Sequence, residues 1–331
     1  MTRKADVLIV GAGIAGLMAA NALRAAGKQV LVVDKGSGVG GRMATRRIGP
    51  GRADHGAQFF TVRTAEFQRY VDPWLRAGLV RVWSRGWSDG SLRNTPADGY
   101  PRYAVRDGMT AVPKQLAAGL DIRTGVRLTA VQPTADGWQA TDEAGSRYDA
   151  RALLLTPPVP QSLALLQAGS TSLSHADRTA LQKVTYAPCL CGLFWVDGTV
   201  QLPEPGALQR PLAPISWIAD NQRKGISPQA RLITVHGGPV FSQEHFADAD
   251  EAVMARLRQA LAPHLAETAV IHEAQLHRWR YALPITRYPE RTLLAENLPP
   301  LAFAGDAFKE PRVEGAALSG LAAARKLTVI G

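Results

Sequence analysis

The feature that most restricts the fold is an apolar run near the amino terminus that leads into three closely spaced glycines. The residues from Val7 to Val10 are apolar, and Gly11, Gly13 and Gly16 follow in the pattern G-x-G-x-x-G, ahead of an alanine-rich stretch. A strand, a tight turn and a helix form the context in which this pattern binds a dinucleotide. A basic start before an apolar stretch is also typical of a secretory signal, which is the alternative. The glycines favour the nucleotide fold.

A second strand and an acidic residue complete this fingerprint. Gly27 is expected to end the helix, and residues 29–33 predict a buried strand that ends at Asp34. In this motif an acidic residue about 20 positions further on binds the ribose. The first glycine permits the sharp turn, the second lets the backbone approach the pyrophosphate, and the third lets the helix pack closely on the strand. Free N–H groups at the start of the helix then face the phosphates.

The composition is ordinary for a globular protein. With 331 residues the chain is long enough for two domains, and 46% hydrophobic and 20% charged residues argue against disorder. No other apolar run approaches the length of a membrane span, so we expect a cytoplasmic protein without a membrane partner. The formal net charge of +10 attracts anions. Because the arginines are scattered and no nucleic-acid motif is present, we expect an anionic small molecule rather than nucleic acid.

The cysteines and histidines do not form ligand sets. Cys189 and Cys191 are two positions apart in an expected strand, which suits neither a disulfide framework nor a zinc site. We expect them to be buried free thiols. The histidines have no repeated metal-ligand spacing, so no metal is expected. His55 is expected to be partly exposed or hydrogen-bonded within its loop, and not to be catalytic.

The loop after Asp34 favours FAD over NAD. It carries Gly40, Gly41 and Arg42, and this G-G-R segment resembles the second glycine loop of the flavin amine oxidase superfamily. In that superfamily the loop and its arginine approach the FAD pyrophosphate and neighbouring groups. A flexible surface loop with a solvated arginine is the alternative.

The carboxyl-terminal end of the chain supports the same resemblance. Residues 301–327 predict a buried strand, Gly305 and Asp306, a loop, and a helix that begins near residues 313–315. This resembles the C-terminal flavin motif of the superfamily, which implies that Asp306 binds the ribityl or pyrophosphate region. It also implies that backbone N–H groups of residues 313–316 face the flavin O2 edge, where a helix N-terminus stabilises negative charge. The alternative is that Asp306 only forms a turn.

The resemblance implies an α/β fold of the amine oxidase and p-hydroxybenzoate hydroxylase type. In this fold a mixed-sheet substrate domain is inserted twice into a Rossmann-type FAD-binding domain. Residues 108–120 predict an amphipathic helix, and residues 121–159 predict a hairpin-rich return to a buried strand. We expect the FAD-binding domain at 1–77, 105–159 and 289–331, and the substrate domain at 78–104 and 160–288.

The resemblance also implies which residues contact FAD. Val126 stands where relatives place a residue at the adenine. The expected cofactor contacts are Gly11, Gly13, Ala15, Gly16, Asp34, Lys35, Gly41, Arg42, Met43, Gly56, Ala57, Gln58, Phe59, Val126, Gly305, Asp306, Arg312, Val313, Glu314 and Ala316. No cysteine belongs to the C-terminal flavin motif, so FAD is expected to be bound non-covalently.

Three segments, in chain order, resemble the renalase family and especially its bacterial members. They are DHGAQFFTVR at 54–63, HRWRYALP at 277–284 and GDAFKEPRVEGAALSG at 305–320. The resemblance implies an FAD-dependent oxidase that oxidises 2- and 6-dihydro isomers of NAD(P)H, a pyridine dinucleotide substrate, with oxygen as acceptor and hydrogen peroxide as product. A flavin amine oxidase or desaturase on a small substrate is one alternative. A non-catalytic FAD-fold binding protein is another.

The same resemblance suggests which side chains lie on the substrate side of the flavin. The candidates are Phe59, Phe60, Trp279 and Tyr281. For each aromatic residue the alternative is a plain place in the hydrophobic core. No residue is assigned to catalysis.

Overall fold

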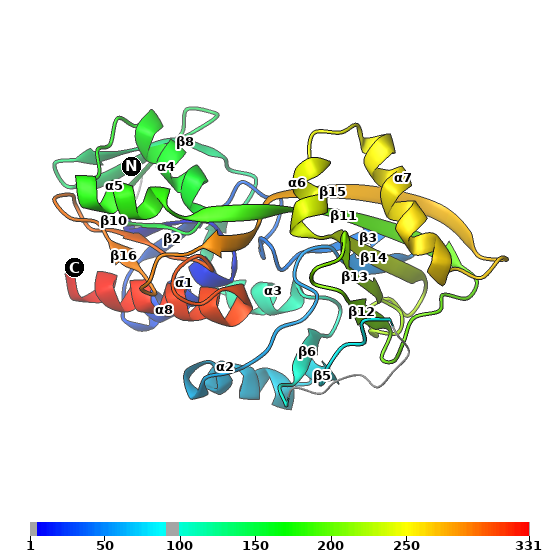
Figure 1. Cartoon of the computed structure of the whole chain (residues 1–331). Helices are drawn as coiled ribbons and strands as arrows, with labels where there is room; N and C mark the ends of the chain where they lie inside the picture. The colour runs from blue at the N-terminus through cyan, green and yellow to red at the C-terminus, as the bar shows by residue number, and fades with distance from the viewer. Residues whose placement is uncertain (1–4, 91–98, 331) are drawn as a thin grey trace. The chain divides into compact units, whose positions relative to one another are not determined.

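The computed structural model describes residues 5–90 and 99–330, and the chain forms two compact units (Figure 1). Unit 1 comprises Met1–Gly41, Val112–Thr185 and Pro284–Gly331, and unit 2 comprises Arg42–Ala111 and Tyr186–Leu283. Each unit therefore assembles segments that are far apart in the sequence.

The division by packing differs from the expected domain boundaries. Residues 42–77 and 105–111, which were expected in the FAD-binding domain, pack within unit 2, and residues 160–185 and 284–288, which were expected in the substrate domain, pack within unit 1. The hairpin at 45–54 contributes Ile48 and Ala53 to a core cluster of unit 2, which explains the first difference. Residues 91–98 of the expected insertion at 78–104 lie outside the described residues. The functional domain boundaries stay a prediction.

Unit 1 is built on an eight-stranded sheet. Five strands form its parallel centre in the order β17, β10, β1, β2, β7, and β16, β9 and β8 add antiparallel pairs. The strands are β1 (Ala5–Val10), β2 (Val30–Val33), β7 (Asp121–Arg123), β8 (Leu128–Thr134), β9 (Gly137–Asp142), β10 (Arg147–Leu155), β16 (Leu293–Leu294) and β17 (Leu301–Phe303).

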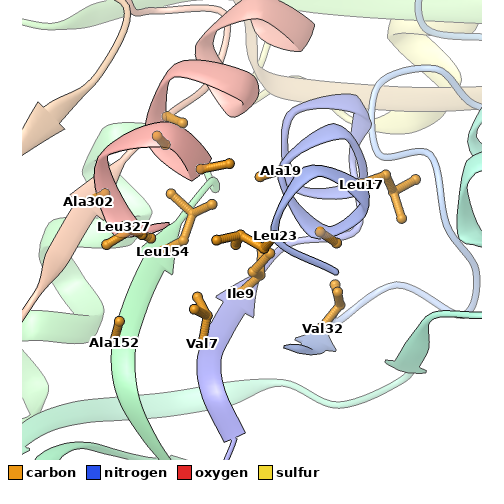
Figure 2. Packing of buried hydrophobic residues seen from close by; sticks show 14 of the residues in the cluster. Val7, Ile9, Leu17, Ala19, Leu23, Val32, Ala152, Leu154, Ala302 and Leu327 are labelled. Atoms are coloured by element: carbon orange, nitrogen blue, oxygen red, sulfur yellow. The ribbon is translucent and has the colours of Figure 1, made fainter. Parts of the chain in front are cut away.

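Helices cover this sheet, and two of them pack tightly on each other. The helices are α1 (Ile14–Ala25), α3 (Ala111–Ala117), α4 (Val159–Ala168), α5 (His175–Gln182) and α8 (Arg312–Ile330). A Cβ at Gly320 of α8 would lie 2.0 Å from the carbonyl oxygen of Ala15 in α1, so this close crossing requires glycine. Figure 2 shows Ile9, Leu23 and Leu154 filling the core between these helices and the sheet.

The elements of unit 1 confirm the secondary structure expected from the sequence. The apolar run and the glycine turn form β1 and the start of α1, not a separate targeting helix. The helix expected at 108–120 is α3, and the hairpin expected within 121–159 is the β8–β9–β10 meander. The strand and helix expected within 301–327 are β17 and α8.

Unit 2 is built on a five-stranded sheet in the order β12-β13-β14-β11-β15, with two short hairpins. Its elements are β3 (Thr45–Ile48), β4 (Gly51–Asp54), α2 (Ala65–Arg76), β5 (Val80–Ser84), β6 (Arg102–Val105), β11 (Thr185–Asp197), β12 (Ala207–Gln209), β13 (Ile215–Asp220), β14 (Arg231–Gly237), α6 (Pro239–Glu244), α7 (Asp250–Leu261), the 3₁₀ turn Ala262–His264 and β15 (Val270–Thr286).

The two faces of the five-stranded sheet differ in character. On one face Phe194 and Val235 pack with Leu257 of α7 in an apolar cluster. Trp217 of β13 and His236 of β14 are paired across strands, so their side chains share a face, which is the one opposite Val235. Trp217 and His236 therefore lie on the face of the sheet opposite the one that packs against α7.

Among the helices in residues 5–90 and 99–330, none is long and apolar enough to cross a bilayer.

Candidate FAD site and its surroundings

The candidate cofactor site of unit 1 begins where parallel strands end. The last residues of β1, β2, β10 and β17 lie in register across the sheet. Gly11, Asp34 and Thr156 directly follow the ends of β1, β2 and β10, and Gly305 lies two residues after the end of β17. In open α/β sheets ligands bind just outside the carboxyl ends of the strands, so the topology brings the two halves of the flavin motif to one edge.

The glycine turn leaves room for a pyrophosphate. Gly11 has a φ of +104°, and a Cβ at Gly16 would lie 2.0 Å from the Gly11 carbonyl oxygen, so both positions require glycine. A Cβ at Gly13 would meet no atom within 4 Å, and no side chain caps the α1 N-terminus there. The open backbone and the free N–H groups of α1 fit the phosphates of FAD.

The second glycine loop lies beside the first. The N–H of Gly40 donates to the carbonyl of Ala12 at 2.9 Å, and a Cβ at Gly41 would lie 3.5 Å from the Cα of Gly13. Ala15 is buried against α8, whereas Lys35 is exposed and its Nζ lies 3.5 Å from the side-chain oxygen of Gln161.

Asp34 links the end of β2 to the segments that follow the two neighbouring strands, β1 and β7. Its Oδ2 accepts from the Ala12 N–H and its Oδ1 from the Gly36 N–H, each at 2.6 Å. Its backbone carbonyl accepts from the Val126 N–H at 2.9 Å, which places Val126 next to the expected ribose site. Each carboxylate oxygen keeps lone-pair capacity for a ribose hydroxyl.

Replacing Asp34 by alanine is expected to weaken FAD binding by about tenfold or more, because hydrogen bonds to a charged group contribute about 1.5–3 kcal/mol each. Quenching of FAD fluorescence by the apoprotein measures the dissociation constant. Asp149→Ala, whose carboxylate accepts from Gln139 on the β9–β10 hairpin, is the control and should leave FAD affinity unchanged. An unaltered dissociation constant in folded Asp34→Ala would reduce Asp34 to a turn-forming residue.

The C-terminal flavin motif is held by a serine of α8. The Ser319 hydroxyl accepts from the Gly305 N–H at 2.8 Å and donates to the Arg291 carbonyl at 2.6 Å. Asp306 and Glu314 are both buried, with 8% of each exposed. Val313 and Ala316, in the first turns of α8, are also buried, whereas Arg312 is exposed and has a φ of +75°.

The remaining expected FAD contacts lie in unit 2. Arg42 donates through Nη1 to the carbonyls of Tyr281 and Ala282, at 3.2 Å each, and its own carbonyl accepts from the Ala57 N–H at 2.8 Å. A Cβ at Gly56 would lie 2.0 Å from the Arg42 carbonyl oxygen, so the two loops touch. Met43 is buried beside them, with 3% exposed.

Gln58 has an unsatisfied oxygen in this loop. Its Nε2 donates to the Asp54 carbonyl at 2.7 Å, and 6% of the residue is exposed. Its Oε1 is buried without a hydrogen-bond partner among the described residues. A buried acceptor without a partner is expected where a ligand supplies the hydrogen bond, so this loop also fits FAD.

The four substrate-side candidates are placed differently. Phe59 is half-buried, with its ring centroid 5.2 Å from that of Trp87 and 5.6 Å from that of Trp217. Phe60 is 3% exposed and lies against Tyr103 in the core. Tyr281 is half-buried against Tyr186. Trp279 stacks on the His55 ring at 5.3 Å.

His55 was expected to be partly exposed or hydrogen-bonded, and it is buried, with its N–H donating to the Ala44 carbonyl at 3.0 Å. It is 7% exposed, its carbonyl accepts from Trp279 Nε1 at 2.8 Å, and its ring lies 4.6 Å from that of His277. Burial, followed by His277, Arg46 and His236, lowers the pKa of His55 to about 3. Burial likewise lowers the pKa of His236 to about 4. These rings are therefore neutral at pH 7.

The two cysteines are free, as expected, and Cys191 is buried while Cys189 is half-buried. Burial raises the pKa of the Cys189 thiol to about 12 and that of Cys191 well above its ordinary value. Neither is a thiolate at neutral pH. Within the described part of the chain, no group of three or more histidine, cysteine or acidic side chains is placed to hold a metal ion.

The chain is similar to known protein families and to a known protein over most of its length. Residues 9–74 match the NAD(P)-binding Rossmann-like domain, and residues 63–328 match the flavin containing amine oxidoreductase family, which is more than half of the chain. The renalase of Mus musculus is 24% identical over 97% of this chain and 98% of that protein.

Two solved structures have the same fold. One is a crystal structure described as a protoporphyrinogen oxidase from Exiguobacterium sp. 255-15, with a TM-score of 0.75, 14% identity, and 99% and 100% of the two chains covered. The other is a putrescine oxidase bound to putrescine, with a TM-score of 0.69, 15% identity and the same coverage.

These matches confirm the α/β fold class, the resemblance to renalase-like flavin amine oxidases, and FAD as the cofactor. The contacts of the individual site residues with FAD stay predictions. By the match over residues 63–328, the chain belongs to the flavin containing amine oxidoreductase family and is an FAD-dependent oxidoreductase.

Proposed function

We propose that this oxidoreductase removes hydride from the 2- and 6-dihydro isomers of NAD(P)H. The products are NAD(P)⁺ and hydrogen peroxide, and the reaction consumes one oxygen molecule and one proton per turnover. The observation that carries the proposal is the similarity to mouse renalase, which extends over 97% of this chain and 98% of that protein. The ordered segments at 54–63, 277–284 and 305–320 support it.

This reaction requires little acid–base chemistry from the side chains of the protein. FAD, when bound, accepts the hydride and passes two electrons to oxygen. Loss of hydride from a dihydropyridine gives an aromatic pyridinium, so no side chain has to remove a proton from the substrate. The task of the protein is to hold the substrate ring at a productive distance and to exclude other orientations.

We propose Phe59, Trp279 and Tyr281 as the side chains that orient the substrate. Each is half-buried, and each lies against another ring that limits its rotation: Trp87 and Trp217, His55, and Tyr186, respectively. Phe60 lies inside the core and is not part of this proposal. The net charge of +10 suits a substrate that carries phosphates.

FAD is proposed to be held without a covalent bond. Cys189 and Cys191 are in the middle of β11, and the raised pKa of each thiol keeps it protonated. A protonated thiol is a poor nucleophile, so neither cysteine is suited to attack the flavin.

Anaerobic mixing with candidate reductants tests the proposed reaction. We expect the isomeric dihydro dinucleotides to bleach the flavin absorbance rapidly, with little bleaching by ordinary 4-dihydro NADH or by primary amines. On admission of oxygen the colour should return and hydrogen peroxide should appear. The control is the same protein mixed with NAD⁺, which carries no hydride to transfer.

An amine oxidase is the second candidate, and one observation favours it. Trp83, Trp87 and Trp217 form a buried aromatic cluster with Phe59, and an apolar aromatic environment suits the presentation of a neutral amine. Rapid bleaching by a primary amine, with the dinucleotide isomers inert, would replace the proposed reaction by amine oxidation and leave the FAD site unchanged.

A further inference from the structure

We propose that Lys224 is a positioning residue of the flavin site, which acts by fixing the loop Gly56–Gln58 through a buried ion pair with Asp54. The inference rests on the expected contact of this loop with FAD, and so on the FAD-dependent function proposed above. All the residues that carry it belong to unit 2. Lys224 lies in no motif of the sequence, where the segment NQRKG has the composition of a solvated turn.

The ion pair is completely buried. Lys224 Nζ lies 2.5 Å from Asp54 Oδ2, and both side chains have 0% exposure. Nζ also lies 5.0 Å from the centroid of the Trp83 ring, which provides a favourable cation–π contact. Burial lowers the pKa of Lys224 and Asp54 opposes that shift.

Asp54 is the centre of a hydrogen-bond network on the amino-terminal side of the loop. Its Oδ1 accepts from the Thr45 hydroxyl at 2.5 Å and from the Met109 N–H at 2.8 Å. Its carbonyl accepts from Thr234 Oγ1 at 2.9 Å and from Gln58 Nε2 at 2.7 Å. The residue thus joins β3, β14 and the loop itself, and a shift of Asp54 would move Gln58.

Lys224 is itself held in a rigid turn. The N–H of Lys224 donates to the Asp220 carbonyl at 2.9 Å, and the Arg81 side chain donates to the Lys224 carbonyl. Asn221, three residues earlier, donates through Nδ2 to the Leu232 carbonyl and to Thr234 Oγ1, at 2.9 Å each. The ammonium group therefore acts from a fixed point, so the Asp54 carboxylate has one position instead of several.

The energetics of buried charge indicate that this ion pair fixes the position of Asp54 more than it adds to the stability of the fold. Removing one partner strands the other charge in the interior, which is strongly destabilising. Replacing both charged residues by neutral residues of similar volume is often neutral for stability. A pair with a merely structural role would therefore be fully replaceable by a neutral pair, whereas a positioning pair would not.

The experiment compares FAD-loaded protein with the double variant Asp54→Asn/Lys224→Met, in which both charges are gone. We expect a urea midpoint close to that of the original protein. We also expect an FAD dissociation constant raised about tenfold or more, a changed flavin absorbance spectrum and a shifted flavin midpoint potential, because small displacements in a site have large effects. These readouts use no substrate, so they are independent of whether the dinucleotide isomers are oxidised.

A second variant keeps the test decisive if the double variant does not fold. Lys224→Arg retains the buried charge but has a longer, planar head group, so it should fold and displace Asp54. We expect its FAD spectrum and midpoint potential to shift in the same direction. Glu204→Gln, which breaks the exposed contact with the neighbouring Arg223, is the control and should change none of these quantities. Original FAD affinity, spectrum and potential in either folded Lys224 variant would overturn the proposal.

Discussion

Gly16→Ala is expected to destabilise the dinucleotide turn itself, whereas Gly13→Ala is expected to weaken FAD binding strongly in a protein that still folds. A Cβ at Gly16 would lie 2.0 Å from the backbone oxygen of Gly11, which has no free side chain to move away. Overpacking of this kind typically costs about 1–3 kcal/mol. A Cβ at Gly13 meets nothing within 4 Å, and its φ of −77° suits alanine.

The open space at Gly13 explains why Gly13→Ala should affect FAD binding and not folding. If the pyrophosphate lies there, a methyl group displaces it while the fold is disturbed by less than about 1 kcal/mol. We expect the FAD dissociation constant of Gly13→Ala to rise about 100-fold, or ~3 kcal/mol.

Urea unfolding of the apoprotein and FAD fluorescence titration measure the two effects separately. Gly27→Ala, at the end of α1, is the control, because its Cβ also meets no atom within 4 Å although its φ is +81°. It should cost some stability and leave FAD binding intact. Normal FAD binding by Gly13→Ala would place the pyrophosphate elsewhere.

Acid is expected to destabilise the protein through His55. Its pKa is about 3 in the folded protein, and its ordinary value is 6.5. Above pH 6.5 the ring is neutral in both states and contributes nothing. As the pH falls below 6.5 the unfolded chain binds a proton that the folded chain rejects, so stability is lost until the pH reaches about 3. At pH 5 the loss is about 2 kcal/mol.

The neighbours of His55 act in the same direction. His277 and His236 also have a lowered pKa, and the cationic Arg46 disfavours a further positive charge. Trp279, stacked on the His55 ring, contributes no titrating group. Acid sensitivity is therefore a property of the cluster, in which burial lowers the pKa of His55 further than that of His236.

The comparison of the FAD-saturated protein with His55→Leu isolates this contribution. The variant should lose about 2 kcal/mol less between pH 7 and pH 5, because leucine binds no proton. Urea midpoints at the two pH values give the difference. The measurement at pH 7 separates any change in packing from the proton effect. Equal pH dependence of the two proteins would show that His55 is not the group responsible.

The sequence by itself determined the nucleotide-binding half of the protein. The G-x-G-x-x-G turn, α1, β2 and Asp34 lie within about 30 consecutive residues, and their conformations are fixed by local rules. A left-handed Gly11 and a close approach at Gly16 can be satisfied by few other residues. The same holds for the strand, loop and helix of the C-terminal motif, from which FAD and the family followed.

Only the tertiary structure decided what surrounds the loop after β4. Lys224 and Asp54 are 170 positions apart, and His55 meets Trp279 across 224 positions. Which side chains meet at such separations depends on strand register, since a slip of one residue turns a side chain to the other face of the sheet. The pairing of β14 with β13 and β11 turns His236 to the face of the sheet that carries Trp217. That same sheet anchors the turn that carries Lys224, so a lysine with the local signature of a solvated turn is buried against Asp54.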